Sequence, residues 1–221
     1  MKGAAGTIPQ PTMSAPAPAS KKLSLKRIVS ILLAVLIGAG LGAAGRWLFF
    51  DQPLPPLAER PNTVVGGPFS LTDQFGIRVQ DADFRGKLML VYFGYTYCPD
   101  VCPTELQTIT AALETLGTAA GEIVPIFITV DPARDTVTLM KDYAANFHPA
   151  LRALSGSPED VATAARSYRI YYAKVQGEGD DDYRMDHTSI VYLMDRKGQY
   201  LAHFPAATAP ERMAKRLRQA L

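Results

Sequence analysis

The sequence predicts an α/β domain, with a mixed β-sheet covered by helices on both faces, preceded by one N-terminal transmembrane helix. Three observations lead to this prediction. Apolar runs with the length of strands alternate with segments of helical periodicity through most of the chain. Two pairs of short strands are separated by turn-forming residues, which indicates β-hairpins. A long uncharged run follows a cluster of cations near the N-terminus.

The N-terminal segment is predicted to comprise a disordered tail, residues 1–27, and a transmembrane anchor, residues 28–50. The first twenty residues of the tail are rich in Gly, Ala, Pro, Ser and Thr and have too little apolar surface to fold. The anchor holds an uncharged run of about 18 residues, the lower limit for crossing a bilayer. Trp47 follows it at the position of an interfacial aromatic residue. One alternative is a buried core helix, against which the flanking cations argue. The other is a signal peptide cleaved near residues 42–44, against which the long leader argues.

The distribution of charge predicts the orientation of the anchor. Residues 1–50 carry six Lys and Arg and no acid, whereas residues 51–221 carry 17 Lys and Arg against 21 Asp and Glu. The two net charges, +6 and −4, sum to the +2 of the whole chain. By the positive-inside rule we expect a single-pass inner-membrane protein with a cytoplasmic tail and a periplasmic domain. The basic balance is therefore a topology signal and not a nucleic-acid footprint, and an exported domain can form disulfides.

Residues 51–61 are predicted to form a stiff linker, because four of them are proline. Residues 62–221 follow as one domain of about 160 residues, enough to bury a proper core. Its predicted elements, in order, are hairpin strands 69–72 and 77–79, strand 87–95, helix 104–116, strand 122–130, helix 135–147, a short strand 151–154, helix 158–168, strand 170–175, hairpin strands 189–194 and 199–204, and helix 210–221.

The two cysteines, Cys98 and Cys102, are the only ones in the chain, and each is followed by proline. They lie between a predicted strand and a predicted helix. Proline is tolerated in the first turn of a helix but not in its interior. The helix is therefore predicted to begin at Pro103, with Cys102 as its N-cap and Cys98 in the loop over the helix start. Thiols at such a strand-to-helix crossover make the thioredoxin-like fold the natural candidate.

Both sulfurs would lie near the positive end of the helix dipole, which favours thiolates. Two soft sulfur ligands suit Cu(I), and the same pair could close a disulfide. The alternative is a purely structural role for the two cysteines, as an inert disulfide or as two buried thiols. A disulfide across so short a loop would constrain the unfolded chain little.

His187 is the candidate for a third ligand, because it enters the strand 189–194 at the edge where crossover loops and strand ends meet. Asp186 or Asp182 could orient the imidazole of His187 through a hydrogen bond. An ordinary loop histidine is the alternative, and local sequence does not separate the two. Asp131 ends a strand and could likewise face the thiol edge, or serve only in the turn that precedes Asp135.

The other candidate residues receive structural interpretations. Asp135 is predicted to be the N-cap of the helix that follows it. His148 is predicted to cap a helix end, where the dipole favours a cation, and His203 to lie on the solvated face of a hairpin strand. We expect neither histidine to bind a metal. Tyr95 and Tyr97 are predicted to form an apolar wall beside the thiols.

Several motifs together resemble those of the Sco/SenC family of membrane-anchored, thioredoxin-like copper proteins. The resemblance covers about residues 66–204 and the anchor. It rests on Gly67-Pro68-Phe69-Ser70-Leu71, Asp83-Phe84-Arg85-Gly86-Lys87, Gly94-Tyr95-Thr96-Tyr97-Cys98-Pro99-Asp100-Val101-Cys102-Pro103, Val130-Asp131-Pro132-Ala133-Arg134-Asp135, Phe147-His148-Pro149 and Asp186-His187-Thr188.

The resemblance implies that Cys98, Cys102 and His187 bind copper, as Cu(I) or Cu(II), and that the cysteines also cycle through a disulfide. It implies a role in cytochrome c oxidase assembly. The protein would deliver copper to the dinuclear copper site of the oxidase, or would keep the thiols of that site reduced. Its partners would be the copper-bearing oxidase subunit, other copper carriers and thiol reductants.

A second class of function is an enzyme, either a membrane-tethered thiol-disulfide oxidoreductase or a peroxiredoxin-like peroxidase. Three residues separate Cys98 from Cys102, whereas thioredoxins have two between their cysteines. The one tryptophan, Trp47, does not precede the first cysteine. A disulfide exchanger also has no need of His187. These points favour a metal carrier over an enzyme.

Overall fold

The computed structural model describes residues 25–49, 65–177 and 182–221. The chain divides into two compact units, residues 1–53 and residues 54–221, and each is described by itself. The predicted linker, residues 51–61, and most of the predicted tail lie outside the described residues.

The described part of the first unit is one helix, α1 (Leu25–Phe49). It coincides with all but the last residue of the predicted anchor, so the prediction of a helix there is confirmed. Its first turn contains no acidic residue. Among the helices in the described ranges, none is long and apolar enough to cross a membrane.

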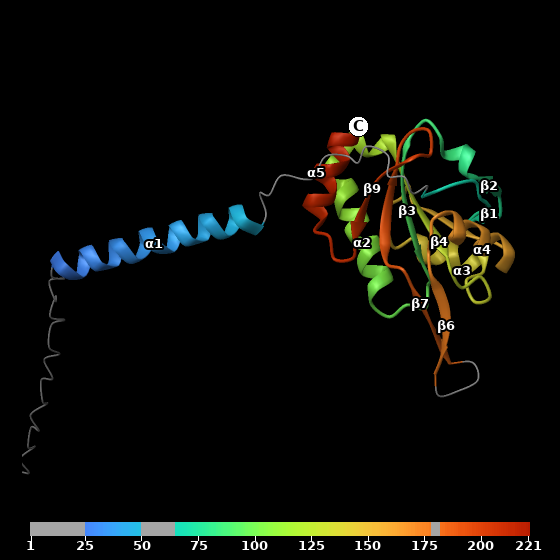
Figure 1. The fold of residues 1–221 in the computed structure, drawn as a ribbon, viewed down its shortest axis with the longest axis horizontal. Coiled ribbons are helices and arrows are strands. Elements are labelled where there is room, and N and C mark those ends of the chain that lie inside the picture. Colours follow the sequence, from blue (N-terminus) through green and yellow to red (C-terminus); the bar gives the residue numbers. More distant parts are fainter. Residues whose placement is uncertain (1–24, 50–64, 178–181) are drawn as a thin grey trace, which may run out of the picture. The chain divides into compact units, whose positions relative to one another are not determined.

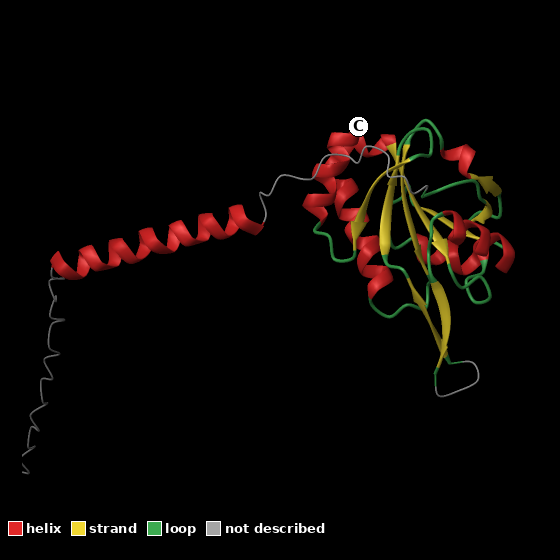
Figure 2. Cartoon of the chain, viewed as in Figure 1, coloured by secondary structure: helices red, strands yellow, loops and turns green. Residues whose placement is uncertain are grey.

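The second unit contains a seven-stranded sheet in the order β2-β1-β5-β4-β3-β8-β9 and a separate two-stranded sheet of β6 and β7 (Figure 1). Helices lie on both sides of the larger sheet (Figure 2). The strands are β1 (Ser70–Asp73), β2 (Arg78–Gln80), β3 (Leu88–Gly94), β4 (Ile123–Thr129), β5 (Arg152–Ser155), β6 (Tyr172–Gln176), β7 (Tyr183–His187), β8 (Ile190–Met194) and β9 (Tyr200–Pro205). The helices are α2 (Val101–Leu116), α3 (Val137–Ala144), α4 (Pro158–Ser167) and α5 (Pro210–Ala220), with 3-10 turns η1 (Asp81–Phe84) and η2 (Gly117–Glu122).

The larger sheet is mixed, as predicted. Strand β3 lies in the interior of the sheet, parallel to β4 and antiparallel to β8. All seven residues of β3 are buried, as expected for a strand covered on both faces. Hairpins β1–β2 and β8–β9 form the two edges. This is the α/β, thioredoxin-like architecture expected from the sequence.

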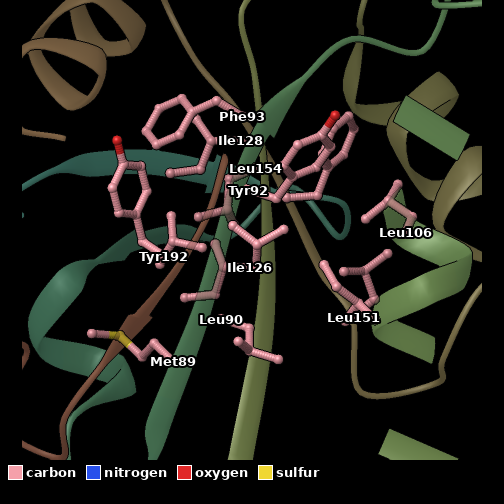
Figure 3. Close-up of a cluster of buried hydrophobic side chains, with 14 of the residues drawn as sticks. Met89, Leu90, Tyr92, Phe93, Leu106, Ile126, Ile128, Leu151, Leu154 and Tyr192 are labelled. Atoms are coloured by element: carbon pink, nitrogen blue, oxygen red, sulfur yellow. The ribbon is translucent and has the colours of Figure 1, made fainter. Parts of the chain in front are cut away.

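The core lies on both faces of β3 and β4 (Figure 3). Successive side chains of a strand point to opposite faces. Tyr92 therefore stacks on Phe127 on one face, with ring centroids 6.1 Å apart, while Phe93 packs against Tyr168 on the other at 5.4 Å. The Tyr92 face is the one that meets the start of α2.

Three features differ from the sequence predictions. Helix α2 begins at Val101, two residues before Pro103. Proline is acceptable there because the first four N–H groups of a helix have no partner within the helix. Helix α3 has Thr136 rather than Asp135 as its N-cap, and the Thr136 hydroxyl accepts a hydrogen bond from the Leu139 N–H. Strand β7, which pairs with β6, was not predicted.

Candidate metal centre

The two cysteines lie where β3 passes into α2. Cys98 is in the crossover loop and Cys102 is the second residue of α2, after the N-cap Asp100. The Cys102 N–H, one of the unpaired donors of the first turn, donates to Cys98 Sγ at 3.4 Å. The structure thus confirms that Cys98 lies at the helix start, but Cys102 is inside the helix rather than its cap. Both are free thiols and both are buried.

His187 reaches the same place from the end of β7. Its Nε2 lies 3.3 Å from Cys102 Sγ. The imidazole is also enclosed by two tyrosine rings, Tyr92 at 6.2 Å and Tyr95 at 6.0 Å between centroids, both in edge-on contact. The three predicted ligand residues therefore come together, although 85 positions separate Cys102 from His187 in sequence.

The two thiols have opposite acidities. The hydrogen bond from Cys102 lowers the pKa of Cys98 to about 3, and His187 and backbone N–H groups act in the same direction against burial. The same thiol–thiol hydrogen bond, followed by burial, raises the pKa of Cys102. The pair thus holds one proton near neutral pH, with the thiolate on Cys98. The helix dipole was expected to favour thiolates at both sulfurs, whereas their mutual hydrogen bond places the thiolate on Cys98 alone.

The imidazole is oriented by the backbone. Nδ1 of His187 lies 3.2 Å from the carbonyl oxygen of Thr188, and this contact orients the ring so that Nε2 faces the sulfur. Asp186 and Asp182 were predicted as candidates for this role. Both side chains are exposed, and Asp186 precedes His187 on β7, so the alternation of the strand directs it to the other face.

Asp131 binds two neighbours at the end of β4. It accepts hydrogen bonds from Arg134 Nε at 2.5 Å and from the Tyr183 hydroxyl at 2.9 Å. Tyr183 is the first residue of β7, the strand that carries His187. Asp131 therefore supports the β7 strand near the thiol edge of the sheet, rather than contacting His187 itself. Arg134 and Tyr183 were not singled out from the sequence, because nothing in their local pattern indicates this cluster.

Asp135 holds the cysteine loop instead of capping α3. Its buried carboxylate accepts from the Thr96 N–H at 3.1 Å, the Thr96 hydroxyl at 2.5 Å and the Thr129 hydroxyl at 2.5 Å. Burial raises the pKa of Asp135, against these hydrogen bonds. The carboxylate thereby ties the loop before Cys98 to the end of β4.

The two tyrosines beside the thiols and the two other histidines match their predicted roles only in part. Tyr95 is buried, as expected of an apolar wall beside the thiols, and it packs edge-on against His187, but Tyr97 is 58% exposed and is no part of such a wall. His148 does not cap α3, which ends at Ala144; its Nδ1 accepts from the Ala150 N–H. His203 lies on the exposed face of β9, as predicted, with its Nδ1 2.6 Å from the Tyr200 hydroxyl.

Two sulfurs and one imidazole nitrogen are a donor set that suits copper in either oxidation state, since thiolates prefer Cu(I) and imidazole also suits Cu(II). In the structure Cys102 Sγ and His187 Nε2 are in direct hydrogen-bonding contact. No group of three or more His, Cys, Asp and Glu side chains in the described ranges is already spaced to hold a metal ion. A metal would therefore replace the direct sulfur–imidazole contact and the proton of Cys102.

Comparisons with known proteins agree with the motifs. A family model described as SCO1/SenC matches residues 57–221. The SCO2-like protein of Rickettsia conorii is 37% identical over 197 residues, which cover 86% of this chain and 96% of that protein. Among solved structures, Bradyrhizobium japonicum ScoI with copper bound is 48% identical, with a TM-score of 0.67 over 71% of this chain and 99% of that one. Arabidopsis thaliana ScoI with copper bound is 40% identical, with a TM-score of 0.67 over 71% and 97%.

Proposed function

This chain belongs to the SCO1/SenC family, and from that premise we propose that it is a copper-carrying assembly factor for cytochrome c oxidase. It binds one copper ion through Cys98, Cys102 and His187. Copper is here the cargo, delivered to the dinuclear copper site of the oxidase. The partners are the copper-bearing oxidase subunit and the carriers that supply the metal.

One observation carries the proposal: His187 Nε2 lies 3.3 Å from Cys102 Sγ, at the helix start where Cys98 accepts a backbone hydrogen bond. An imidazole beside two thiols supplies soft ligands for Cu(I) and a borderline ligand for Cu(II). Cys98 is held as thiolate, so binding a monovalent ion requires the loss of at most one proton, from Cys102. The copper-bound relatives support the same cargo.

A second candidate function is the reduction of disulfides at the copper site of the oxidase. The observation that favours it is the asymmetry of the thiols. An acidic, hydrogen-bonded Cys98 beside a buried Cys102 resembles a nucleophile with its resolving partner. Both activities use the same pair, and the copper carrier is the better supported because His187 completes a ligand set.

We further propose that residues 28–50 anchor the protein in the inner membrane, with residues 51–221 in the periplasm. The support is the uncharged run in the sequence and the count of six cations and no acid in residues 1–50. A reporter enzyme that is active only after export, fused after Asp51, should be active. Activity of a reporter that works only in the cytoplasm would refute the proposed topology.

Copper titration of the reduced protein tests the main proposal. We expect one Cu(I) per chain, no tight binding in Cys98→Ser or Cys102→Ser, and moderately weaker binding in His187→Ala. The loss of the imidazole should weaken the binding of Cu(II) more than that of Cu(I). The matched control is His148→Ala combined with His203→Ala, which should bind like the wild type. Unchanged copper stoichiometry and affinity in both cysteine variants would refute the copper function.

A further inference from the structure

The proposed ligands come from two separate parts of the fold. Cys98 and Cys102 belong to the crossover that follows β3, an interior strand of the seven-stranded sheet. His187 ends β7, which pairs with β6 in a sheet of its own, and these two strands extend away from the body of the domain (Figure 1). A two-stranded ribbon is marginally stable by itself, so the position of His187 depends on how this ribbon is docked.

Arg134 contacts the ribbon at the other end of β7. Its Nη1 donates to the Tyr183 carbonyl at 3.0 Å, and its guanidinium lies 3.6 Å from the centroid of the Tyr183 ring. Asp131 closes the cluster, since it accepts from both Arg134 and the Tyr183 hydroxyl. Lys174 of β6 covers the same ring with its Nζ 3.7 Å from the centroid.

Arg134 also contacts the cysteine loop. Its guanidinium lies 4.7 Å from the ring centroid of Tyr97, the residue before Cys98, and 5.9 Å from that of Tyr95, which packs on His187. The Arg134 side chain is only 20% exposed. One partly buried cation therefore contacts both the segment that carries the thiols and the strand that carries the imidazole.

We infer that Arg134 is a positioning residue, which fixes His187 relative to the two sulfurs by docking the β6–β7 hairpin on the cysteine loop. The use of this positioning in copper binding rests on the proposed function, whereas the contacts of Arg134 do not depend on it. Tyr183 is four residues from His187, about 13 Å along an extended strand, so a shift at the Arg134 end moves the imidazole. A planar guanidinium can hydrogen-bond and stack at once, which a lysine ammonium cannot do.

The first test needs no copper. The Tyr92 and Tyr95 rings displace the His187 ring-proton resonances in NMR spectra, so these shifts report where the imidazole lies. In Arg134→Met they should move toward unfolded-chain values, and β7 amides should exchange about tenfold faster. Arg196→Met is the matched control, since Arg196 also donates to a carboxylate and a carbonyl, those of Glu122 and Gly86. It should leave both readings unchanged.

The second test uses copper alone. Arg134→Met should weaken Cu(II) binding about tenfold or more, as is typical when a ligand loses its support, and leave Cu(I) within about threefold because both thiolates remain. Arg134→Lys should resemble Arg134→Met, since fork geometry rather than charge is required. Tyr183→Leu gives an independent test should Arg134→Met not fold.

Wild-type ring-proton shifts, amide exchange and Cu(II) affinity in both Arg134→Met and Tyr183→Leu would overturn the inference. So would equal effects of Arg134→Met and Arg196→Met. If the wild-type protein bound no copper, the proposed function would fail, while the shifts of His187 would still decide whether Arg134 positions it.

Discussion

Cys98 and Cys102 are four residues apart and chemically unlike. Cys98 receives hydrogen bonds from the Cys102 thiol, from His187 and from backbone N–H groups, which together stabilise its thiolate. Cys102 is fully buried and supplies the shared proton. A helix N-terminus favours the thiolate form of either cysteine. Here, however, the Cys102 thiol keeps its proton and donates it in a hydrogen bond to the Cys98 thiolate. The asymmetry therefore follows from their mutual contact.

Cys98 should react with iodoacetamide at a rate that changes little between pH 8 and pH 5. Its lowered pKa means that the thiolate persists as the pH falls and is lost only near pH 3. An unperturbed thiol, with a pKa of about 8.5, loses thiolate several-hundred-fold over the same range. The measurement is the pH dependence of alkylation, followed by mass spectrometry of the reduced protein.

Two variants control this measurement. Cys102→Ala removes the main cause of the lowered pKa and should move the alkylation profile of Cys98 to higher pH. Cys98→Ala should abolish the fast reaction, because Cys102 has no exposed surface. A wild-type rate that falls with pH like that of a free thiol would contradict the assignment of the thiolate to Cys98.

At the scale of the elements, strand β3 and helix α2 pack in close contact at Gly94. A Cβ added at Gly94 would lie 2.8 Å from Cys102 Sγ, 2.9 Å from Phe127 Cε2 and 3.2 Å from Tyr92 Cε1. Carbon atoms do not approach buried sulfur or ring atoms so closely without displacing them. The space that Gly94 leaves is therefore filled by the thiol of Cys102.

Gly94→Ala should destabilise the domain by about 1–3 kcal/mol, as is usual when a packed core is overfilled. It should also weaken Cu(I) binding, because the displaced atom is a proposed ligand. Urea unfolding and copper titration measure the two effects. Gly121→Ala is the control, since its Cβ would meet no atom within 4 Å, and it should change stability by less than about 0.5 kcal/mol. Equal unfolding midpoints for the two variants would disprove this account.

Most elements of the domain could be predicted because their signals are local. The capping box of Ser157 and Asp160 at the start of α4 is an example, since both hydrogen bonds form within three residues. Strand β7 could not be predicted from Tyr183–His187, because its burial alternates between half-buried and exposed positions and its pairing to β6 is set by tertiary contacts. The role of Asp135 could not be predicted either, because its hydrogen bonds are also tertiary contacts. Its partner Thr96 is 39 positions away, and local sequence carries no sign of it.

At the scale of the whole molecule, metal binding at the site is linked to the stability of the folded protein. The three proposed ligands lie on the crossover loop, the first turn of α2 and the end of β7, so a metal held by all three would link the large sheet to the β6–β7 hairpin. A ligand that binds the folded state alone stabilises it, by about 2.7 kcal/mol at 100 times the dissociation constant. The three proposed ligands could be named from the sequence, but the way in which the hairpin is held became apparent only in the fold.

Copper uptake by the whole protein should depend on the redox state of its thiols. A disulfide between Cys98 and Cys102 has no thiolate to offer a metal, so the oxidised protein should not gain stability from Cu(I), whereas the dithiol form should unfold at higher temperature when Cu(I) is added. Bound copper should in turn protect both sulfurs from oxidation and alkylation. In an oxidising compartment, loading would then require a separate reductant. The test is to titrate Cu(I) into the two forms side by side without added reductant, following the unfolding temperature and the copper bound. Because only the dithiol supplies the soft ligands, equal uptake by both forms would show that the cysteines are not the copper ligands.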